Sequence, residues 1–397
     1  MIIAGGAAAL LVVVVLTAVV ARALGPHRYL GPLKPLDGAV SAVAFSPDGK
    51  LVATALAVGT DAGQIKLWDA ETGRPQSRKS SDSQGRIDVP AQVMSLAFSS
   101  DSDTLAAGLA NGSAHVWSLE AGGSQVIGTP SSPPTPTYPA DPYPTDPLPY
   151  PSIPLPTPSL PLPFPSGLIP TDLEPGFKRS SHGPSKAPAP LPTRAPEGSA
   201  FVAFVGDGER LAVAAGEKVE VYEVAGGTPR QSLDSSGTQV RSVAVSDNAK
   251  LLAAGRADGS VQVWDLASGR ATLTLKGHLD DVGAVAFHPT KELLASGSAD
   301  GTTRLWQLPA GTETAMLTGH DQEVRSLAFS PNGKTLVTGG SKSPVRLWDV
   351  GRRTAAARFD GHAQGVTSVA YSPDGRTVIA GGTTADAWLS DVSSLPS

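Results

Sequence analysis

The chain of 397 residues contains no cysteine, so cysteine usage says nothing about the redox compartment in which it works. It also lacks an excess of basic residues, since 31 Lys and Arg stand against 36 Asp and Glu, for a net charge of −5. Proteins that bind nucleic acid usually carry a basic surface. The composition therefore argues against nucleic acid as a partner.

Motifs of catalysis and of cofactor binding are missing as well. The sequence has no G-x-S-x-G, no G-x-x-x-x-G-K-[ST] and no H-E-x-x-H. The stretch Gly206-Asp207-Gly208 lacks the remaining glycine of a dinucleotide loop and is interpreted as a turn. Neither His115 nor His288 has a cysteine or a second histidine at ligand spacing. We therefore expect no cofactor and no metal.

What the sequence does contain is a repeat marked by tryptophan. Trp264, Trp306 and Trp348 are spaced 42 residues apart, Trp388 follows after 40, and Tyr222 lies 42 residues before Trp264. Self-similarity at a fixed period near 40 residues indicates a repeat architecture. Such scaffolds usually present a surface and seldom a catalytic cleft.

Each copy has the pattern of four short strands. An alternating apolar segment ends in an aromatic residue, a turn such as Ser-Pro-Asp-Gly follows, and two further strands precede an outer segment. Four antiparallel strands in about 40 residues form a propeller blade. Seven copies begin near Val40, Val93, Ala200, Val240, Val282, Val324 and Val366. The pattern predicts an all-β, seven-bladed propeller.

The repeat resembles the WD-repeat family of β-propellers. The resemblance rests on three Trp-Asp pairs, which begin at Trp68, Trp264 and Trp348, and on three Gly-His pairs, which end at His278, His320 and His362. It covers the chain outside the first 24 residues and one insert. Richness in alanine, valine and glycine indicates a bacterial-type member.

The resemblance also implies a buried quartet of side chains that ties a blade together. Blade five has all four members, namely His278, Ser296, Asp300 and Trp306. In blade six Lys342 falls where the Asp is expected, and blades one to four lack the His. We expect the quartet to stiffen one blade and apolar packing to hold the rest.

The last copy stops after its third strand, near Val392. The segment before Val40 has the spacing of a fourth strand, so residues 28–34 are predicted to pair with the strand that carries Trp388. This pairing would remove two open sheet edges, which otherwise invite aggregation.

Residues 2–21 hold no charge. Twenty helical residues span roughly 30 Å, the thickness of the hydrocarbon core of a bilayer. Residues 1–24 are therefore predicted to form a single-pass transmembrane helix. The alternative is a cleaved signal peptide, but no Lys or Arg precedes the apolar run, and the run is long for that role. Arg22, Arg28 and Lys34 follow the span, which places the propeller in the cytoplasm.

A proline-rich insert is predicted over residues 129–197. Residues 129–196 hold 23 of the 36 prolines, so the segment should be extended and disordered. It separates residues 25–128, which contain the ring-closing strand and blades one and two, from residues 198–397, which contain blades three to seven. The P-x-x-P spacing within residues 151–161 fits a ligand of a proline-binding groove. A solvated spacer is the favoured alternative, because dense proline produces this spacing by chance.

Two functions are compared. The first is a membrane-anchored, non-catalytic scaffold for protein–protein interaction, since relatives use the loops between blades and the channel mouth to hold proteins. The candidate loop residues are Asp280, Asp281, Gln322, Glu323 and Gln364, which are equally typical of an ordinary solvated rim. The second is an enzyme or a small-ligand sensor that uses the central channel. The inner strands read SAVAFS, SLAFS, SVAVS and AVAFH, without a repeated acid or base, which argues against it.

Overall fold

The structure is a computed structural model that describes residues 28–33, 36–58, 62–128, 195–359, 365–384 and 386–393. The predicted transmembrane segment 1–24 and residues 129–194 of the predicted insert lie outside the described residues. Within the described ranges, no helix is long and apolar enough to cross a membrane.

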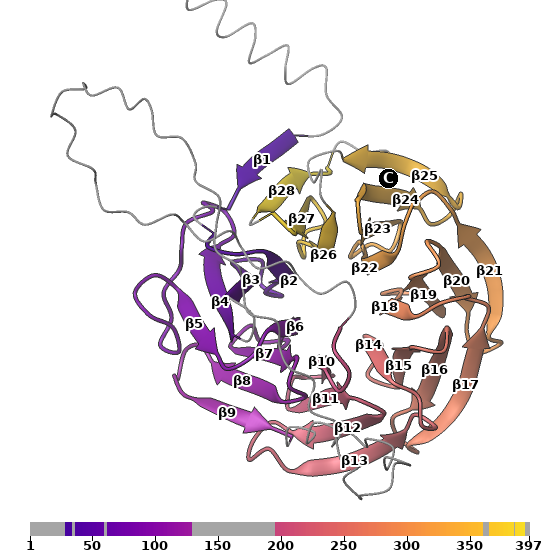
Figure 1. Cartoon of the computed structure of the whole chain (residues 1–397), viewed down its shortest axis with the longest axis horizontal. Helices are drawn as coiled ribbons and strands as arrows, with labels where there is room; N and C mark the ends of the chain where they lie inside the picture. The colour runs from indigo at the N-terminus through magenta and orange to yellow at the C-terminus, as the bar shows by residue number, and fades with distance from the viewer. Residues whose placement is uncertain are drawn as a thin grey trace, which may run out of the picture. The chain divides into compact units, whose positions relative to one another are not determined.

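The described strands form seven antiparallel sheets of four strands each, which confirms the predicted seven-bladed propeller. The sheets are arranged around a centre, with one strand of each at the inside of the ring and one at the outside (Figure 1).

Blades one to three follow each other along the chain, on either side of the insert. Blade one contains β2 (Val40–Phe45), β3 (Leu51–Val58), β4 (Ala62–Asp69) and β5 (Arg86–Val89). Blade two contains β6 (Val93–Phe98), β7 (Thr104–Leu109), β8 (Ala114–Ser118) and β9 (Ser124–Ile127). Blade three contains β10 (Ala200–Val205), β11 (Arg210–Ala215), β12 (Lys218–Glu223) and β13 (Pro229–Asp234).

The next three blades repeat the same order. Blade four contains β14 (Val240–Val245), β15 (Leu251–Arg256), β16 (Ser260–Asp265) and β17 (Arg270–Lys276). Blade five contains β18 (Val282–Phe287), β19 (Leu293–Ser298), β20 (Thr303–Gln307) and β21 (Thr312–Leu317). Blade six contains β22 (Val324–Phe329), β23 (Thr335–Gly340), β24 (Ser343–Asp349) and β25 (Thr354–Phe359).

Blade seven is assembled from both ends of the chain. It contains β26 (Val366–Tyr371), β27 (Thr377–Gly382) and β28 (Ala387–Asp391), and its outer strand is β1 (Arg28–Pro32). The antiparallel register joins Pro32 to Trp388, and the N–H of Leu33 donates to the carbonyl of Ala387 at 2.9 Å. The predicted pairing of residues 28–34 is thus confirmed for 28–32, while Lys34 lies outside the described residues.

The core lies between neighbouring blades, where the tryptophans pack against the preceding sheet. Trp306 of blade five lies in one apolar cluster with Val261 of blade four. In the same way Trp68 of blade one packs with Leu389 of blade seven and with Leu33, which is 1% exposed. Burial of each blade therefore depends on its neighbour, and blade one depends on the closure of the ring.

A β-bulge marks the second residue of six inner strands. In β2, β6, β14, β18, β22 and β26 the pairing with the next strand shifts between the first and the third residue. The inner strand of blade three, β10, keeps a regular register. A bulge leaves its extra residue outside the regular ladder, so the second residue of these six strands is not held in the regular pairing.

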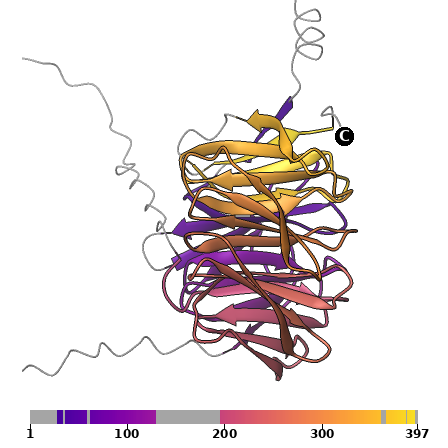
Figure 2. The same cartoon turned by 90° about the vertical axis from the view of Figure 1, so that its right-hand side faces the viewer.

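Strands alternate in direction within each blade. The connections from an outer strand to the next blade therefore share one face with the turns between the second and third strands. We call this face the loop face. Figure 2 shows the ring from its side, with loops along both of its faces.

Candidate partner-binding face

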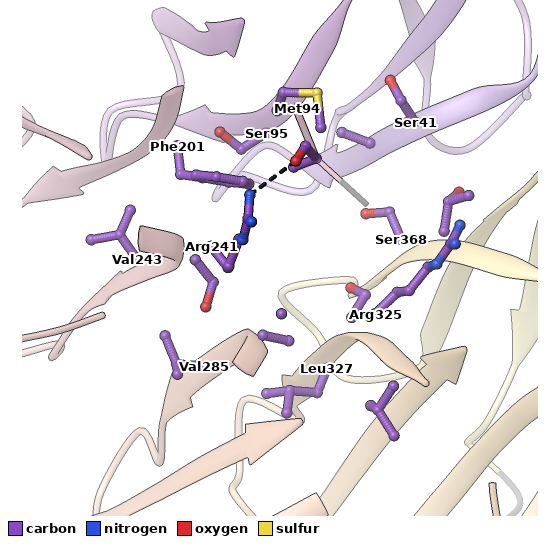
Figure 3. Close-up of a pocket in the computed structure, with 18 of the residues that line it drawn as sticks. Ser41, Met94, Ser95, Phe201, Arg241, Val243, Val285, Arg325, Leu327 and Ser368 are labelled. Atoms are coloured by element: carbon purple, nitrogen blue, oxygen red, sulfur yellow. Dashed lines mark hydrogen bonds between the residues drawn. The ribbon is translucent and has the colours of Figure 1, made fainter. Parts of the chain in front are cut away.

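The second residues of the inner strands surround a cavity of about 360 Å³ at the centre of the ring, which we call the channel mouth. They are Ser41, Met94, Phe201, Arg241, Gly283, Arg325 and Thr367, one from each blade. Figure 3 shows labelled side chains from all seven inner strands converging on this cavity. Charged side chains line the cavity at blades four to six, where Val243, Val285 and Leu327 also line it, and the apolar Met94 and Phe201 line it at blades two and three.

Arg241 connects three parts of the molecule at the channel mouth. Its Nε lies 3.3 Å from Oδ2 of Asp281, and the two side chains are only 12% and 10% exposed. Its Nη1 donates to the carbonyl oxygen of Ala195 at 2.9 Å. Ala195 belongs to the segment predicted as the insert, so the last residues before blade three are held at the mouth.

A second ion pair lies two blades further around the ring. The guanidinium of Arg325 binds the carboxylate of Glu323, which also accepts a hydrogen bond from the hydroxyl of Ser341. Gly283 of blade five lies between the two arginines in the order of the ring. A Cβ at Gly283 would meet only the carbonyl oxygen of Val324, at 3.6 Å, so this position is a notch in the lining.

The two arginines correct the expectation that the channel wall has no repeated charge. That expectation was based on segments such as SVAVS and SLAFS, which begin at the third residue of the inner strand and so omit the second. The residue directly after the first valine is arginine in blades four and six, and it lines the channel mouth. Comparing this one position across the seven copies would have revealed Arg241 and Arg325.

The candidate loop residues divide into two groups. Asp281 and Glu323 line the channel mouth, and Asp281 is 8% exposed, so its carboxylate faces the cavity rather than projecting from the rim. Asp280 and Gln322 are exposed on the loop face. Gln364 lies outside the described residues.

The four residues proposed as a quartet in blade five are joined by hydrogen bonds. The Nδ1 of His278 lies 2.9 Å from Asp300 Oδ2, and its Nε2 lies 2.8 Å from Ser296 Oγ, which also accepts from Trp306 Nε1 at 2.8 Å. Burial lowers the pKa of His278, an effect that the Asp300 carboxylate opposes. Burial alone would raise the pKa of Asp300, but its hydrogen bonds, the first from Thr302, lower it to about 2.

Blade six retains two of these links without an aspartate. The hydroxyl of Thr338 accepts from Trp348 Nε1 at 2.8 Å and lies 2.7 Å from His320 Nε2. Burial, and then the charge of Arg346, lower the pKa of His320 to about 4. Its Nδ1 is buried with no hydrogen-bond partner.

Lys342 does not occupy the place of Asp300, although it has the same spacing from the tryptophan. Gly340 pairs with Ser343, so the hairpin turns in two residues, and Lys342 has a φ of 51°. The Ser343 hydroxyl instead accepts from the N–H of Asp321 at 3.3 Å, the role that the Asp300 carboxylate has toward Leu279.

Other blades use polar links that the sequence comparison missed. In blade one, Trp68 Nε1 donates to Thr54 Oγ1 at 2.9 Å, and in blade seven Trp388 Nε1 donates to Asp386 Oδ2 at 3.1 Å. Apolar packing is therefore supplemented by an indole hydrogen bond outside blades five and six. Thr54 stands where blade five has Ser296, a correspondence that an alignment of the second strands reveals.

The side chains of the described ranges contain no group of three or more His, Cys, Asp or Glu residues arranged to hold a metal ion.

Comparison with known proteins identifies the repeat. The family described as WD domain, G-beta repeat matches six segments, residues 30–69, 85–118, 227–265, 269–307, 311–349 and 353–387. Blade three has no match of its own, in keeping with Tyr222 in place of the tryptophan. A comparison with curated proteins gives no significant match. Since the six segments cover more than half of the sequence, the chain belongs to the WD40 family of β-propeller proteins.

Proposed function

We propose that this protein is a membrane-anchored, non-catalytic scaffold that binds other proteins through its loop face, centred on the channel mouth. WD40 propellers commonly serve as protein-interaction scaffolds. The observation that carries the proposal is the channel mouth itself, a cavity of about 360 Å³ with two ion pairs on one side and Met94 and Phe201 on the other. Such a mixture of apolar and polar groups suits a protein surface that inserts a side chain.

The charge of the loop face favours a basic partner. Among the described residues of its loops and adjoining strand ends, seven exposed side chains are acidic and three are basic. The acidic ones are Asp37, Glu197, Glu217, Asp234, Asp258, Asp280 and Asp321, and the basic ones are Lys218, Lys276 and Lys342. Charge complementarity of this kind speeds association and suppresses wrong partners.

The ion pairs support binding over catalysis. A general acid or base must exchange a proton with its substrate near the working pH. The carboxylates of Asp281 and Glu323 each form an ion pair with a guanidinium, which holds them at the wall of the cavity. They are better placed to fix the shape of the mouth than to transfer protons.

The substitution Gly283→Leu tests the proposal, because a side chain at this position enters the cavity without a backbone clash. The full chain is crosslinked and affinity-captured in its native membrane. Proteins held by the wild type should be lost from Gly283→Leu and kept by Lys250→Leu, which adds the same side chain at an exposed position of the opposite face. Equal capture by both variants would contradict binding at the mouth.

A small-ligand sensor is the second candidate, because the cavity has the volume of a small-molecule site. On this alternative, a metabolite-sized compound raises the melting temperature of the wild type, and Gly283→Leu abolishes the rise without any effect on captured proteins.

Membrane attachment through residues 2–21, with the propeller in the cytoplasm, is part of the proposal and rests on the uncharged run and the basic residues after it. A reporter enzyme that works only in the cytoplasm should be active when it is fused to the C-terminus, and a reporter that works only outside the cytoplasm should be inactive there. For residues 151–161 we favour a spacer over a ligand for proline-binding grooves. Replacing Pro151 and Pro154 by alanine should then leave capture unchanged.

A further inference from the structure

The loop His278–Asp281, which joins blade four to blade five, differs from its neighbour in how tightly its backbone is held. The N–H of Leu279 donates to Asp300 Oδ2 at 3.0 Å, and the carbonyl of Asp280 accepts from Ser298 Oγ at 2.8 Å. The N–H of Ala299 donates to the carbonyl of Asp281 at 2.8 Å. Every residue of the loop is thus bonded to blade five.

The turn of blade four supports the same loop from the other side. A Cβ at Gly259 would lie 2.7 Å from the carbonyl oxygen of His278 and 3.3 Å from that of Asp280, so the two backbones are in close contact. The corresponding loop of blade six is held more loosely, by a 3.3 Å hydrogen bond from Asp321 to Ser343 and a 3.1 Å bond from Ser341 to Glu323.

This firmly held loop presents an apolar side chain to solvent. Leu279 is 90% exposed, whereas the other exposed large apolar residues of the described ranges, Val58, Val126 and Met316, are between 41% and 54% exposed. The Asp300 carboxylate of the quartet is hydrogen-bonded to both His278 and the N–H of Leu279. The blade with the complete quartet therefore carries the most exposed leucine of the described residues.

We propose that the loop His278–Asp281 is a rigid docking element that places Leu279 in an apolar pocket of a protein partner with a basic pocket rim. Exposed acidic side chains stand on the same loop and on neighbouring segments of the loop face, namely Asp280 beside the leucine, Asp258 on the turn of blade four that packs against this loop, and Asp321 on the loop of blade six. A partner that buries the leucine must face these negative charges, and Lys or Arg at the rim of its pocket complements them.

The hydrogen bonds of the loop explain why it suits this role. A loop that is already ordered loses little conformational freedom on binding, so more of the energy of burying the leucine appears as affinity. Asp281 continues the same loop into the channel mouth, where it pairs with Arg241. The inference rests on the proposed function, since it assigns the partner chemistry at one sector of the same face.

The test places a photo-crosslinking phenylalanine analogue at position 279 of the full chain in its native membrane, and at position 316 as the matched control. Met316 is half-exposed on the outer strand of the same blade. Adducts at 279 should exceed those at 316 several-fold, should join segments rich in apolar residues and Lys or Arg, and should weaken in high salt. Equal yields at the two sites, or adducts in acidic segments, would overturn the proposal.

Variants then separate this inference from the function on which it rests. Leu279→Ala should reduce capture of the crosslinked partner about tenfold or more, and Met316→Ala should leave it unchanged. Asp280→Lys should weaken capture more than Asp321→Lys. If Gly283→Leu abolishes capture while Leu279→Ala does not, the docking role of the loop is refuted and the proposed function stands. If neither variant changes capture, both proposals fail.

Discussion

Arg241 and Asp281 join two blades at the centre of the ring, with 3.3 Å between Nε and Oδ2 and both side chains largely buried. The same guanidinium binds the carbonyl of Ala195, so one side chain holds blade four, blade five and the segment that enters blade three. Nothing in the sequence spacing connects these three regions, which the closed ring brings together.

Removing this guanidinium should destabilise the protein. Arg241→Ala leaves the buried carboxylate of Asp281 without its arginine and should lower the free energy of unfolding by about 3 kcal/mol. Urea denaturation of the full chain measures the change. The exposed pair Arg352–Asp349 is the matched control, because Arg352 is 74% exposed, and Arg352→Ala should change stability by less than about 1 kcal/mol. The double variant Arg241→Met, Asp281→Leu should recover most of the loss.

The hydroxyl of Thr338 is bonded to two buried side chains, whereas that of Thr54 accepts from one indole and otherwise makes only a long hydrogen bond, of 3.4 Å, to the carbonyl of Lys66. Thr338→Val should therefore be the more harmful change, with a loss of about 2–4 kcal/mol against about 1–2 kcal/mol for Thr54→Val. Both threonines are fully buried and the substitution keeps their shape, so the comparison isolates the hydrogen bonds. Thermal or urea unfolding of both variants provides the test, and equal losses would contradict the double role.

Stability should fall in mild acid because of His320. Its pKa is lowered to about 4 in the fold, against an ordinary 6.5, so the unfolded chain binds the extra proton between these values. The free energy of unfolding is therefore unaffected by this histidine above pH 6.5. It decreases as the pH falls toward 4, by about 3 kcal/mol in total. His320→Gln should flatten the pH dependence of the unfolding midpoint over this window. Some slope should persist, since burial also lowers the pKa of His278 and His288.

Closure of the ring should depend on Leu33. This residue is 1% exposed and packs with Trp68 at the junction of blades seven and one. Leu33→Ala should cost about 2–4 kcal/mol through lost burial and the cavity left behind. Val58→Ala, at a site 41% exposed, is the control and should have little effect. An equally small effect of both changes would show that β1 contributes little to the closed ring.

The architecture was predictable because the same strand pattern occurs in seven copies along the sequence. The tryptophan period, the turns and the missing fourth strand were enough to place the blades and to identify β1 as the partner of β28. The candidate site was less predictable. Asp281 and Glu323 were singled out as loop residues, but their position at the cavity and their arginine partners depend on how the inner strands meet at the centre of the ring.

Spacing along the sequence predicted a wrong correspondence where a turn differs in length between two blades. Lys342 and Asp300 have the same distance in sequence from their tryptophans, yet the two-residue turn of blade six removes any equivalent position. Similarly, the sequence shows Leu279 only as one residue of a polar loop. The structure adds that its N–H donates to the Asp300 carboxylate and that the Ser298 hydroxyl donates to the carbonyl of Asp280.

The sequence by itself determined the number of blades, their strand order and the WD40 family, because these follow from periodic patterns that each copy repeats. The tertiary structure was needed to show which side chains meet at the channel mouth and which loop has its backbone hydrogen-bonded to the next blade. The physical reason is that Arg241, Asp281 and Ala195 come from different blades or segments, and they become neighbours only when successive blades pack around the centre of the ring.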